Sequence, residues 1–208
     1  MNKALLVDVG GTNMRYAIAS KNSDSISDIN KLPFDSNDFE MQLEQLINEN
    51  HIEILVLSAA GPKINNSISM TNRNFIFNAS DIKNKFGLKE CFLLNDWEAI
   101  AYSYDFVSDS IEFIKEGSQF NKNTLFFGPG TGLGAALSLN NKIVLPTEIG
   151  NTTNSSLSLQ KNYNVENSAH LTLEDFVSGS AISNIYKIKT NTQMSVSYTH
   201  LRAHETTH

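Results

Sequence analysis

The sequence predicts an α/β fold in which a largely parallel β-sheet is covered by helices. Apolar runs typical of buried strands alternate along the chain with amphipathic segments typical of helices, an order that favours parallel strands. A Gly-rich turn between two apolar runs occurs twice, in residues 5–20 (LLVDVGGTNMRYAIAS) and in residues 124–139 (TLFFGPGTGLGAALSL). This repetition, about one small domain later in the chain, predicts two related α/β domains.

The first domain opens with a strand, a turn and a second strand. Residues 4–7 are continuously apolar, and residues 14–19 alternate large side chains with small or charged ones. After a polar linker, residues 36–50 predict an amphipathic helix that begins with a capping box of Asn37 and Glu40. The apolar face of this helix consists of Phe39, Leu43, Leu46 and Ile47.

Two further strand and helix pairs follow. Residues 54–57 predict a buried strand, and residues 80–88 predict a short helix with Ser80 as its N-cap and Gly87 beyond its end. Residues 91–94 form the next apolar run, after which helical spacing resumes within three residues.

We divide the chain into domains at residues 1–105 and 106–190, followed by a tail at residues 191–208. The second domain contains the repeated Gly-rich turn, a polar stretch at residues 151–168 that predicts a loop or weak hairpin, and renewed amphipathic spacing at residues 173–188. The tail is polar and has three histidines in its final nine residues. Because it resembles a translated cloning junction and has no core to hold a metal site, we expect it to be non-native.

Composition and charge exclude several classes of protein. The chain has 208 residues, of which 40% are hydrophobic, and a net charge of -6 without a basic cluster, so nucleic acid is not an expected partner. No apolar run approaches the roughly 18 residues that a membrane span needs, and no cleavable apolar segment follows Asn2 and Lys3, so we expect neither membrane spanning nor secretion. The single cysteine, Cys91, cannot form an intrachain disulfide and is expected in the core. We therefore expect a cytoplasmic protein with small-molecule partners.

The Gly-rich turns predict phosphate binding. A dinucleotide fingerprint or a P-loop places its glycines before a helix, whereas a strand follows here. Consecutive backbone N–H groups in such a turn can form an anion site, Thr12 and Asn13 can add donors, and Asp8 can hold Mg²⁺. The alternative is an ordinary tight hairpin with local turn bonds. Two such turns in one chain favour a pair of phosphate clamps.

Asn95 and Asp96 form a second candidate site. They follow the apolar run at residues 91–94, where open α/β sheets place their ligands, and a carboxylate there can accept a proton from a substrate hydroxyl. The alternative is that Asp96 is simply the N-cap of the helix that follows.

Seven segments of the chain, in order, resemble the bacterial glucokinase family of the actin-like sugar kinase superfamily. They are DVGGTNMRYAIA, AAGP, MTNRNF, LLNDWEAIAYS, GPGTGLGAAL, TEIGN and EDFVSGSAISNIY. The resemblance covers about residues 3–190. It implies an α/β fold of the actin-like (ribonuclease H-like) sugar kinase type, with a complete first domain and an incomplete second one, in which the two domains close over a sugar and ATP.

The resemblance also implies roles for single residues. Asp96 corresponds to the catalytic base. The two phosphate loops correspond to Gly10, Gly11, Thr12 and Asn13 in the first turn, and to Gly130, Thr131 and Gly132 in the second. The residues that hold sugar hydroxyls correspond to Asn95, Glu148 and Glu174.

The chain departs from the family pattern in three places, one of which is the downstream Gly-Pro-Gly-Leu type turn, here Gly179-Ser180-Ala181-Ile182. The family's Glu-Gly-Gly-His segment is here Glu148-Ile149-Gly150-Asn151. Asn151 can still donate and accept hydrogen bonds in place of the histidine, but the identity of the hexose is left open. The last third of the family pattern, with its adenine-contacting turn, does not follow, so we expect the chain as given to be an inactive fragment.

The leading hypothesis is phosphorylation of a hexose with ATP and Mg²⁺, most simply glucose to glucose 6-phosphate in glycolysis, by an enzyme that can form a homodimer. The alternative is a non-catalytic, sugar- or nucleotide-binding regulatory protein descended from a sugar kinase. DNA-binding repressors of this superfamily carry an added segment before the first strand, whereas only three residues precede it here.

Overall fold

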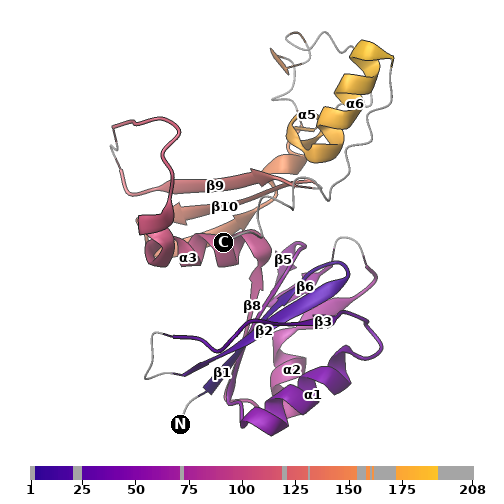
Figure 1. The fold of residues 1–208 in the computed structure, drawn as a ribbon, viewed down its shortest axis with the longest axis vertical. Helices are drawn as coiled ribbons and strands as arrows, with labels where there is room; N and C mark the ends of the chain where they lie inside the picture. Colours follow the sequence, from indigo (N-terminus) through magenta and orange to yellow (C-terminus); the bar gives the residue numbers. More distant parts are fainter. Residues whose placement is uncertain are drawn as a thin grey trace. The chain divides into compact units, whose positions relative to one another are not determined.

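The computed structural model describes residues 3–20, 25–70, 73–118, 121–130, 132–153, 158–159, 161 and 172–191 (Figure 1). The chain divides into two units, residues 1–118 and 119–208. The tail beyond residue 191 and most of the 151–168 stretch lie outside the described residues. The domain boundary that we expect after residue 105 stays a prediction.

The first unit is built on a five-stranded sheet with the strand order β3-β2-β1-β4-β8. Its strands are β1 (Lys3–Val9), β2 (Asn13–Ser20), β3 (Asn30–Pro33), β4 (Ile54–Ala59) and β8 (Glu90–Asn95). β1, β4 and β8 run parallel, whereas β1, β2 and β3 form an antiparallel meander. The sheet is therefore mixed and not largely parallel as expected, because the Gly-rich turn is too short for the crossover connection that a parallel pair needs.

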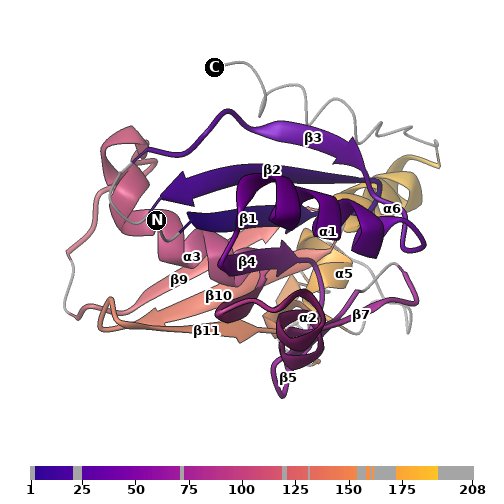
Figure 2. The same ribbon diagram turned by 90° about the horizontal axis from the view of Figure 1, so that it is seen from below.

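Two helices, α1 (Phe39–Asn50) and α2 (Ala79–Phe86), lie together against one face of this sheet (Figures 1 and 2). The strands contribute alternate residues such as Leu5 and Leu55 to the core beneath them. The predicted apolar face of α1 is confirmed, since all four of its residues are buried in this core: Phe39, Leu43, Leu46 and Ile47.

The start of α1 differs from the sequence prediction. The helix begins after Asp38, whose side chain makes no cap hydrogen bond, and the capping box of Asn37 and Glu40 is not formed. Instead, the Asp35 carboxylate accepts a hydrogen bond from the Asn37 backbone N–H at 2.8 Å. The prediction was wrong because the same short polar residues can close a local turn just ahead of a helix.

The short helix α2 ends where the sequence predicts, but its N-terminus is capped by a different residue from the predicted one. Gly87 closes it in the left-handed conformation, with φ at 62°. Its N-cap is Asn78, whose side chain accepts from the Asp81 backbone N–H at 3.0 Å, so the assignment of Ser80 as N-cap was wrong. The helix starts earlier than its apolar spacing indicates, because a strand leads directly into it.

A second, small sheet in the first unit was not predicted. Its antiparallel strands are β5 (Lys63–Ile64), β6 (Ser67–Ser69) and β7 (Ile76–Asn78), too short to show an alternating pattern. The chain enters this sheet through Gly61, which has φ at 149°. A Cβ atom there would lie 2.0 Å from the Ser69 carbonyl oxygen, so this turn requires glycine.

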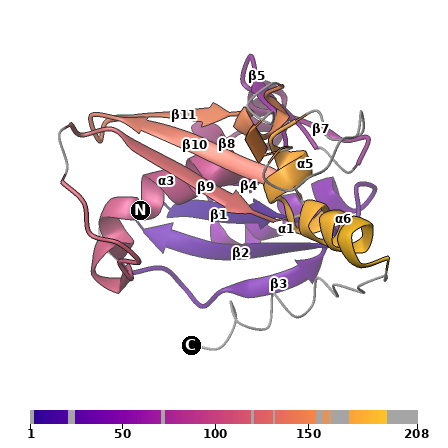
Figure 3. The same ribbon diagram turned by 90° about the horizontal axis from the view of Figure 1, so that it is seen from above.

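The second unit repeats the opening of the first. Its antiparallel sheet has the order β11-β10-β9, with β9 (Thr124–Pro129), β10 (Leu133–Leu139) and β11 (Ile143–Thr147), in the same sequence as β1, β2 and β3. A 3₁₀ turn, η2 (Ile149–Asn151), follows β11. The helices α5 (Glu174–Val177) and α6 (Gly179–Thr190) lie beyond one end of this sheet (Figures 1 and 3). The predicted repeat of strand, Gly-rich turn and strand is therefore confirmed.

The helices are short. β8 leads directly into α3 (Asp96–Val107), which the 3₁₀ helix η1 (Ser108–Ser110) follows. The helices α1, α3 and α6 each have 12 residues. In the part of the chain that the structure describes, no helix is both long enough and apolar enough to cross a membrane.

Cys91 is buried on β8, as predicted, and burial raises the pKa of its thiol to about 11. At pH 8 the thiolate fraction of the folded chain is then roughly one part in a thousand. We therefore expect a thiol-reactive disulfide reagent to label the native chain at pH 8 at least about a hundredfold more slowly than the chain unfolded in guanidinium. Equal labelling rates in the two states would contradict this burial.

The same pKa sets an alkaline limit on stability. Because the folded pKa lies above the ordinary value of 9.0, ionisation of the thiol favours the unfolded chain. The contribution of Cys91 to stability is complete below pH 9 and is lost as the pH rises towards 11.

Candidate active site

The carboxyl ends of three neighbouring strands bring the first unit's candidate residues to one edge of the sheet. The register pairs Val9 of β1 with Ala59 of β4, and Ala59 with Asn95 of β8. Since adjacent strands lie about 4.8 Å apart, the first Gly-rich turn and Asn95 begin about 10 Å from each other. This register places the residues of the predicted ligand site at one edge of the sheet, and the site itself stays a prediction.

The first Gly-rich turn, residues 10–13, is partly closed on itself. The Gly10 N–H donates to the Asn13 carbonyl oxygen at 2.9 Å, and the Asn13 side chain donates to the Thr12 hydroxyl at 2.9 Å. The backbone N–H groups of Gly11 and Thr12 have no partner among the described residues, and a Cβ atom on Gly11 would meet open space. Two adjacent N–H groups are thus available to an anion, fewer than the turn's sequence alone indicates.

Asp8 lies just before this turn and is about half exposed. Its carboxylate accepts from the Arg15 guanidinium at 3.4 Å and from the Ser58 hydroxyl at 3.3 Å, both at the long end of hydrogen-bond distances. No cluster of three metal-ligating side chains occurs among the described residues. A lone, exchangeable carboxylate fits Mg²⁺, which is usually held by one or two carboxylates together with substrate phosphates.

Asn95, and not Asp96, has the main capping role at the start of α3. The Asn95 side-chain oxygen accepts from the backbone N–H groups of Trp97 at 2.9 Å and Glu98 at 3.4 Å. In return, the Glu98 carboxylate accepts from the Asn95 backbone N–H at 3.1 Å, which completes a capping box. Asp96 is the first residue of the helix, and its carboxylate also accepts from the Trp97 N–H, at 3.0 Å.

A buried ion pair supports this capping box. Both carboxylate oxygens of Glu98 lie 3.0 Å from the Lys63 ammonium, and the Glu98 side chain is only 6% exposed. The Asn95 amide also donates to the Gly61 carbonyl oxygen at 2.9 Å. Sequence reasoning missed Lys63 and Glu98, although the Asn95-x-x-Glu98 spacing is a capping-box signal.

We expect the Lys63→Met variant to lose about 3 kcal/mol of unfolding free energy, because it leaves the Glu98 carboxylate buried and unpaired. The double variant K63M/E98Q should recover part of this loss, since the glutamine side chain is neutral and its amide oxygen could still accept from the Asn95 N–H. Urea unfolding followed by the fluorescence of Trp97 measures both.

The exposed Lys83–Glu90 pair provides a matched control for this prediction, because its side chains are 41% and 55% exposed. Lys83→Met should change stability by less than about 1 kcal/mol. Equal losses in K63M and K83M would show that the Lys63–Glu98 pair does not hold the start of α3.

The second unit brings its own candidate residues around the second Gly-rich turn. The Leu133 backbone N–H donates to the Glu174 carboxylate at 3.0 Å. A Cβ atom on Gly132 would lie 2.6 Å from the same carboxylate oxygen, so glycine lets Glu174 reach the turn. The Gly179 N–H donates to the Gly130 carbonyl oxygen at 2.9 Å. The start of α5 and the start of α6 therefore both fix this turn.

Glu148 and Asn151 lie on the adjoining 3₁₀ turn. The Asn151 side chain donates to the Glu148 carboxylate at 3.1 Å, and both side chains are exposed. Gly150, between them, packs against Leu133 and the Glu174 carboxylate. The second unit thus assembles these three sequence-predicted sugar contacts beside its Gly-rich turn. Thr131 is outside the described residues.

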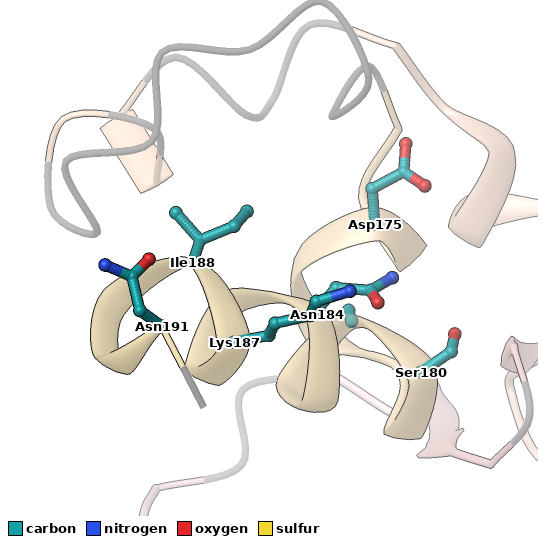
Figure 4. A pocket seen from close by; sticks show the side chains of 7 residues that line it. Asp175, Ser180, Asn184, Lys187, Ile188 and Asn191 are labelled. Atoms are coloured by element: carbon teal, nitrogen blue, oxygen red, sulfur yellow. The ribbon is translucent and has the colours of Figure 1, made fainter. Parts of the chain in front are cut away.

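A hollow of about 520 Å³ lies along α6, apart from these residues (Figure 4). Asp175 and Lys187 are the charged residues that line it. The Asp175 carboxylate already accepts from the Thr172 backbone N–H at 2.9 Å and from its hydroxyl at 2.8 Å. The hollow contains none of the candidate residues, and we do not assign the active site to it.

Comparison with solved structures defines the class of protein. The chain superimposes on a glucokinase from an Antarctic psychrotroph with a TM-score of 0.73 and 27% identity, covering 94% of this chain and 67% of that one. A ROK hexokinase from Thermus thermophilus shares the fold, with a TM-score of 0.63 at 16% identity over 92% of this chain and 65% of that one. The fold is therefore that of the actin-like α/β sugar kinases, as the sequence predicts.

Sequence comparison identifies the family. A sequence model described as Glucokinase matches residues 5–208, and the chain belongs to the glucokinase family. The glucokinase of Tolumonas auensis is 29% identical over an alignment of 199 residues that covers 89% of this chain and 61% of the relative. The glucokinase of Colwellia psychrerythraea is 35% identical over an alignment of 139 residues that covers 64% of this chain and 42% of the relative. The chain spans about 61% of the length of the first of these relatives.

Proposed function

We propose that this chain carries the phosphoryl-transfer residues of an ATP-dependent hexose kinase that converts glucose to glucose 6-phosphate. The observation that carries the proposal is that Asp96 and a Gly-rich turn, two of whose N–H groups have no described partner, lie at the same edge of one sheet. Membership of the glucokinase family supports the choice of ATP and glucose.

In this proposal Asp96 is the general base. It lies at the N-terminus of α3, where the helix dipole favours the ionised carboxylate. One oxygen accepts from the Trp97 N–H at 3.0 Å, which orients the carboxylate. As the sugar 6-hydroxyl attacks the terminal phosphorus of ATP, Asp96 accepts its proton and the bond from phosphorus to the leaving oxygen breaks.

The phosphates are held by the Gly-rich turns. The available N–H groups of Gly11 and Thr12 can donate to phosphate oxygens and stabilise the charge that spreads over them during transfer. Gly130 and Gly132 are proposed to do the same in the second unit. Mg²⁺ bound with the nucleotide would be held by Asp8 and would neutralise phosphate charge.

The sugar hydroxyls are proposed to contact Asn95, Glu148, Asn151 and Glu174. Asn95 can offer only one amide hydrogen, since its other donor and its oxygen are already bonded. Glu174 keeps the oxygen that does not bind the Leu133 N–H. Because an amide at position 151 stands where the family has an imidazole, we expect a weaker preference for glucose over its epimers.

We further infer that the protein works in cytoplasmic glycolysis as a homodimer and does not bind nucleic acid. A net charge of -6 without a basic cluster supports the last of these inferences.

The role of Asp96 can be tested in a chimaera in which the C-terminal part of the Tolumonas auensis glucokinase follows residue 190. Asp96→Asn should lower kcat by roughly 10² to 10⁴, because the amide cannot accept the hydroxyl proton. Nucleotide affinity should change little, and the chimaera should still fold, because Asn95 provides the cap.

Asp105→Asn is the matched control, since Asp105 is exposed on the same helix and its substitution removes the same negative charge. Its kcat should equal that of the unchanged chimaera. If Asp96→Asn retained more than about a tenth of the original kcat, Asp96 would not be the base.

The second Gly-rich turn can be tested with Gly130→Val. A Cβ atom on Gly130 would have nothing within 4 Å, so the variant should fold. The side chain would occupy the space that phosphate must enter, and ATP affinity measured by calorimetry on the same chimaera should fall at least about tenfold. Gly117→Val, also in open space, should leave the affinity unchanged; a result in which both variants bind ATP normally would rule this turn out as a phosphate loop.

A further inference from the structure

Arg73 binds the first Gly-rich turn from a distant part of the sequence. It lies between β6 and β7, and its Nε–H donates to the Gly11 carbonyl oxygen at 2.9 Å across 62 positions of the chain. Nothing in the turn's own sequence indicates this contact. The guanidinium is therefore held beside Gly11, in the turn where the backbone N–H groups of Gly11 and Thr12 are available to an anion.

A second contact holds the guanidinium beside an aromatic ring. The Arg73 Cζ atom lies 5.2 Å from the centroid of the Phe34 ring, within the range of a cation–π interaction. Phe34 is 4% exposed, and its backbone N–H donates to the Thr12 carbonyl oxygen at 3.1 Å. Of the two groups that hold the Arg73 side chain, Gly11 belongs to the first Gly-rich turn and Phe34 is hydrogen-bonded to it. The guanidinium is therefore pre-organised at this turn.

The other two nitrogens of the guanidinium make no hydrogen bond to the described residues. Its Nε is used, but Nη1 and Nη2 have no partner among the described residues. The neighbouring cation differs in this respect, because Arg15 is paired with Asp8. No acidic side chain forms an ion pair with Arg73 in the described part of the chain. A fork of two donors and an unbalanced positive charge therefore remain at this turn.

We propose that Arg73 binds phosphate oxygens of the nucleotide's polyphosphate at the first Gly-rich turn, together with the N–H groups of Gly11 and Thr12. The inference rests on the proposed function and adds a residue to it. A guanidinium fork matches a phosphate group with two parallel hydrogen bonds, whereas backbone N–H groups supply one each. The ligand class is a di- or triphosphate, since two phosphate groups can contact the fork and the N–H groups at once.

Calorimetric titration of the chain with pyrophosphate tests the proposal directly. Arg73→Gln removes the charge and the fork and retains an N–H donor, so its affinity should be roughly tenfold to a hundredfold lower. Arg73→Lys keeps the charge and should show an intermediate loss. Lys83→Gln removes one positive charge from the surface of the same unit, away from the turn, and should leave the affinity unchanged.

A purely structural role for Arg73 has a different signature. It would shift the amide resonances of Gly11 and Thr12 in the free R73Q and R73K variants alike, and both would lose the same affinity. That pattern would overturn the proposal, as would pyrophosphate binding in R73Q equal to that of the unchanged chain. A graded loss, from the unchanged chain through R73K to R73Q with the free amide resonances in place, would support it.

The failure of this inference can be distinguished from failure of the proposed function. If the unchanged chain does not bind pyrophosphate, the first turn is not a polyphosphate site and Arg73 has no such role. The hexose kinase activity of the chimaera, and its loss in Asp96→Asn, is measured separately and does not depend on that titration.

Discussion

The side chain of Asn95 is the contact on which the first unit's candidate site depends. One amide group bonds the Gly61 carbonyl oxygen and the N–H of Trp97, and so joins the turn after β4 to the start of α3. The Glu98 carboxylate binds the Asn95 backbone in return and is neutralised by Lys63. Because each of these groups is buried or partly buried, removing one leaves another unsatisfied. Asp96 takes its position from this network.

The two Gly-rich turns share a strand arrangement and differ in how they are fixed. The first turn is closed by its own Gly10 to Asn13 hydrogen bond and is bound from outside by Arg73. The second is held by Glu174 and by the Gly179 N–H at the start of α6. The two Gly-rich turns thus share a backbone arrangement but are bound by different residues, since the segments that follow the two hairpins differ. In both turns, available N–H groups or open space remain for a ligand.

Charge is distributed unevenly at the first turn. Asp8 and Arg15 balance each other, and both are about half exposed, so their attraction is weakened by water. The Lys63–Glu98 pair is largely buried and stabilises structure. Arg73 alone among these cations lacks a described acidic partner. The positive charge of Arg73 therefore supports the proposal of an anionic ligand at this edge of the sheet, where Asp96 begins α3.

Much of the architecture could be read directly from local patterns. The apolar spacing of Phe39, Leu43, Leu46 and Ile47 predicted the buried face of α1, and the repeated Gly-rich turn predicted the repeated hairpin. Patterns of three or four residues were less reliable. The capping box at Asn37 was wrong, and the real one at Asn95 was overlooked, because capping residues serve equally in turns. The roles given to Glu148, Asn151 and Glu174 stay predictions.

The sequence by itself determined the alternation of the main strands and helices, the two Gly-rich turns and the candidate base at a strand end, because each depends on neighbours within a few positions. The short strands β5, β6 and β7 show no such local pattern and were missed. Only the tertiary structure decided that Lys63 neutralises Glu98 and that Arg73 reaches Gly11, contacts that span 35 and 62 positions. The local spacing of apolar and polar residues in the sequence does not indicate such pairs. They arise because the folded sheet brings distant segments together, and burial then makes each polar group depend on a specific partner.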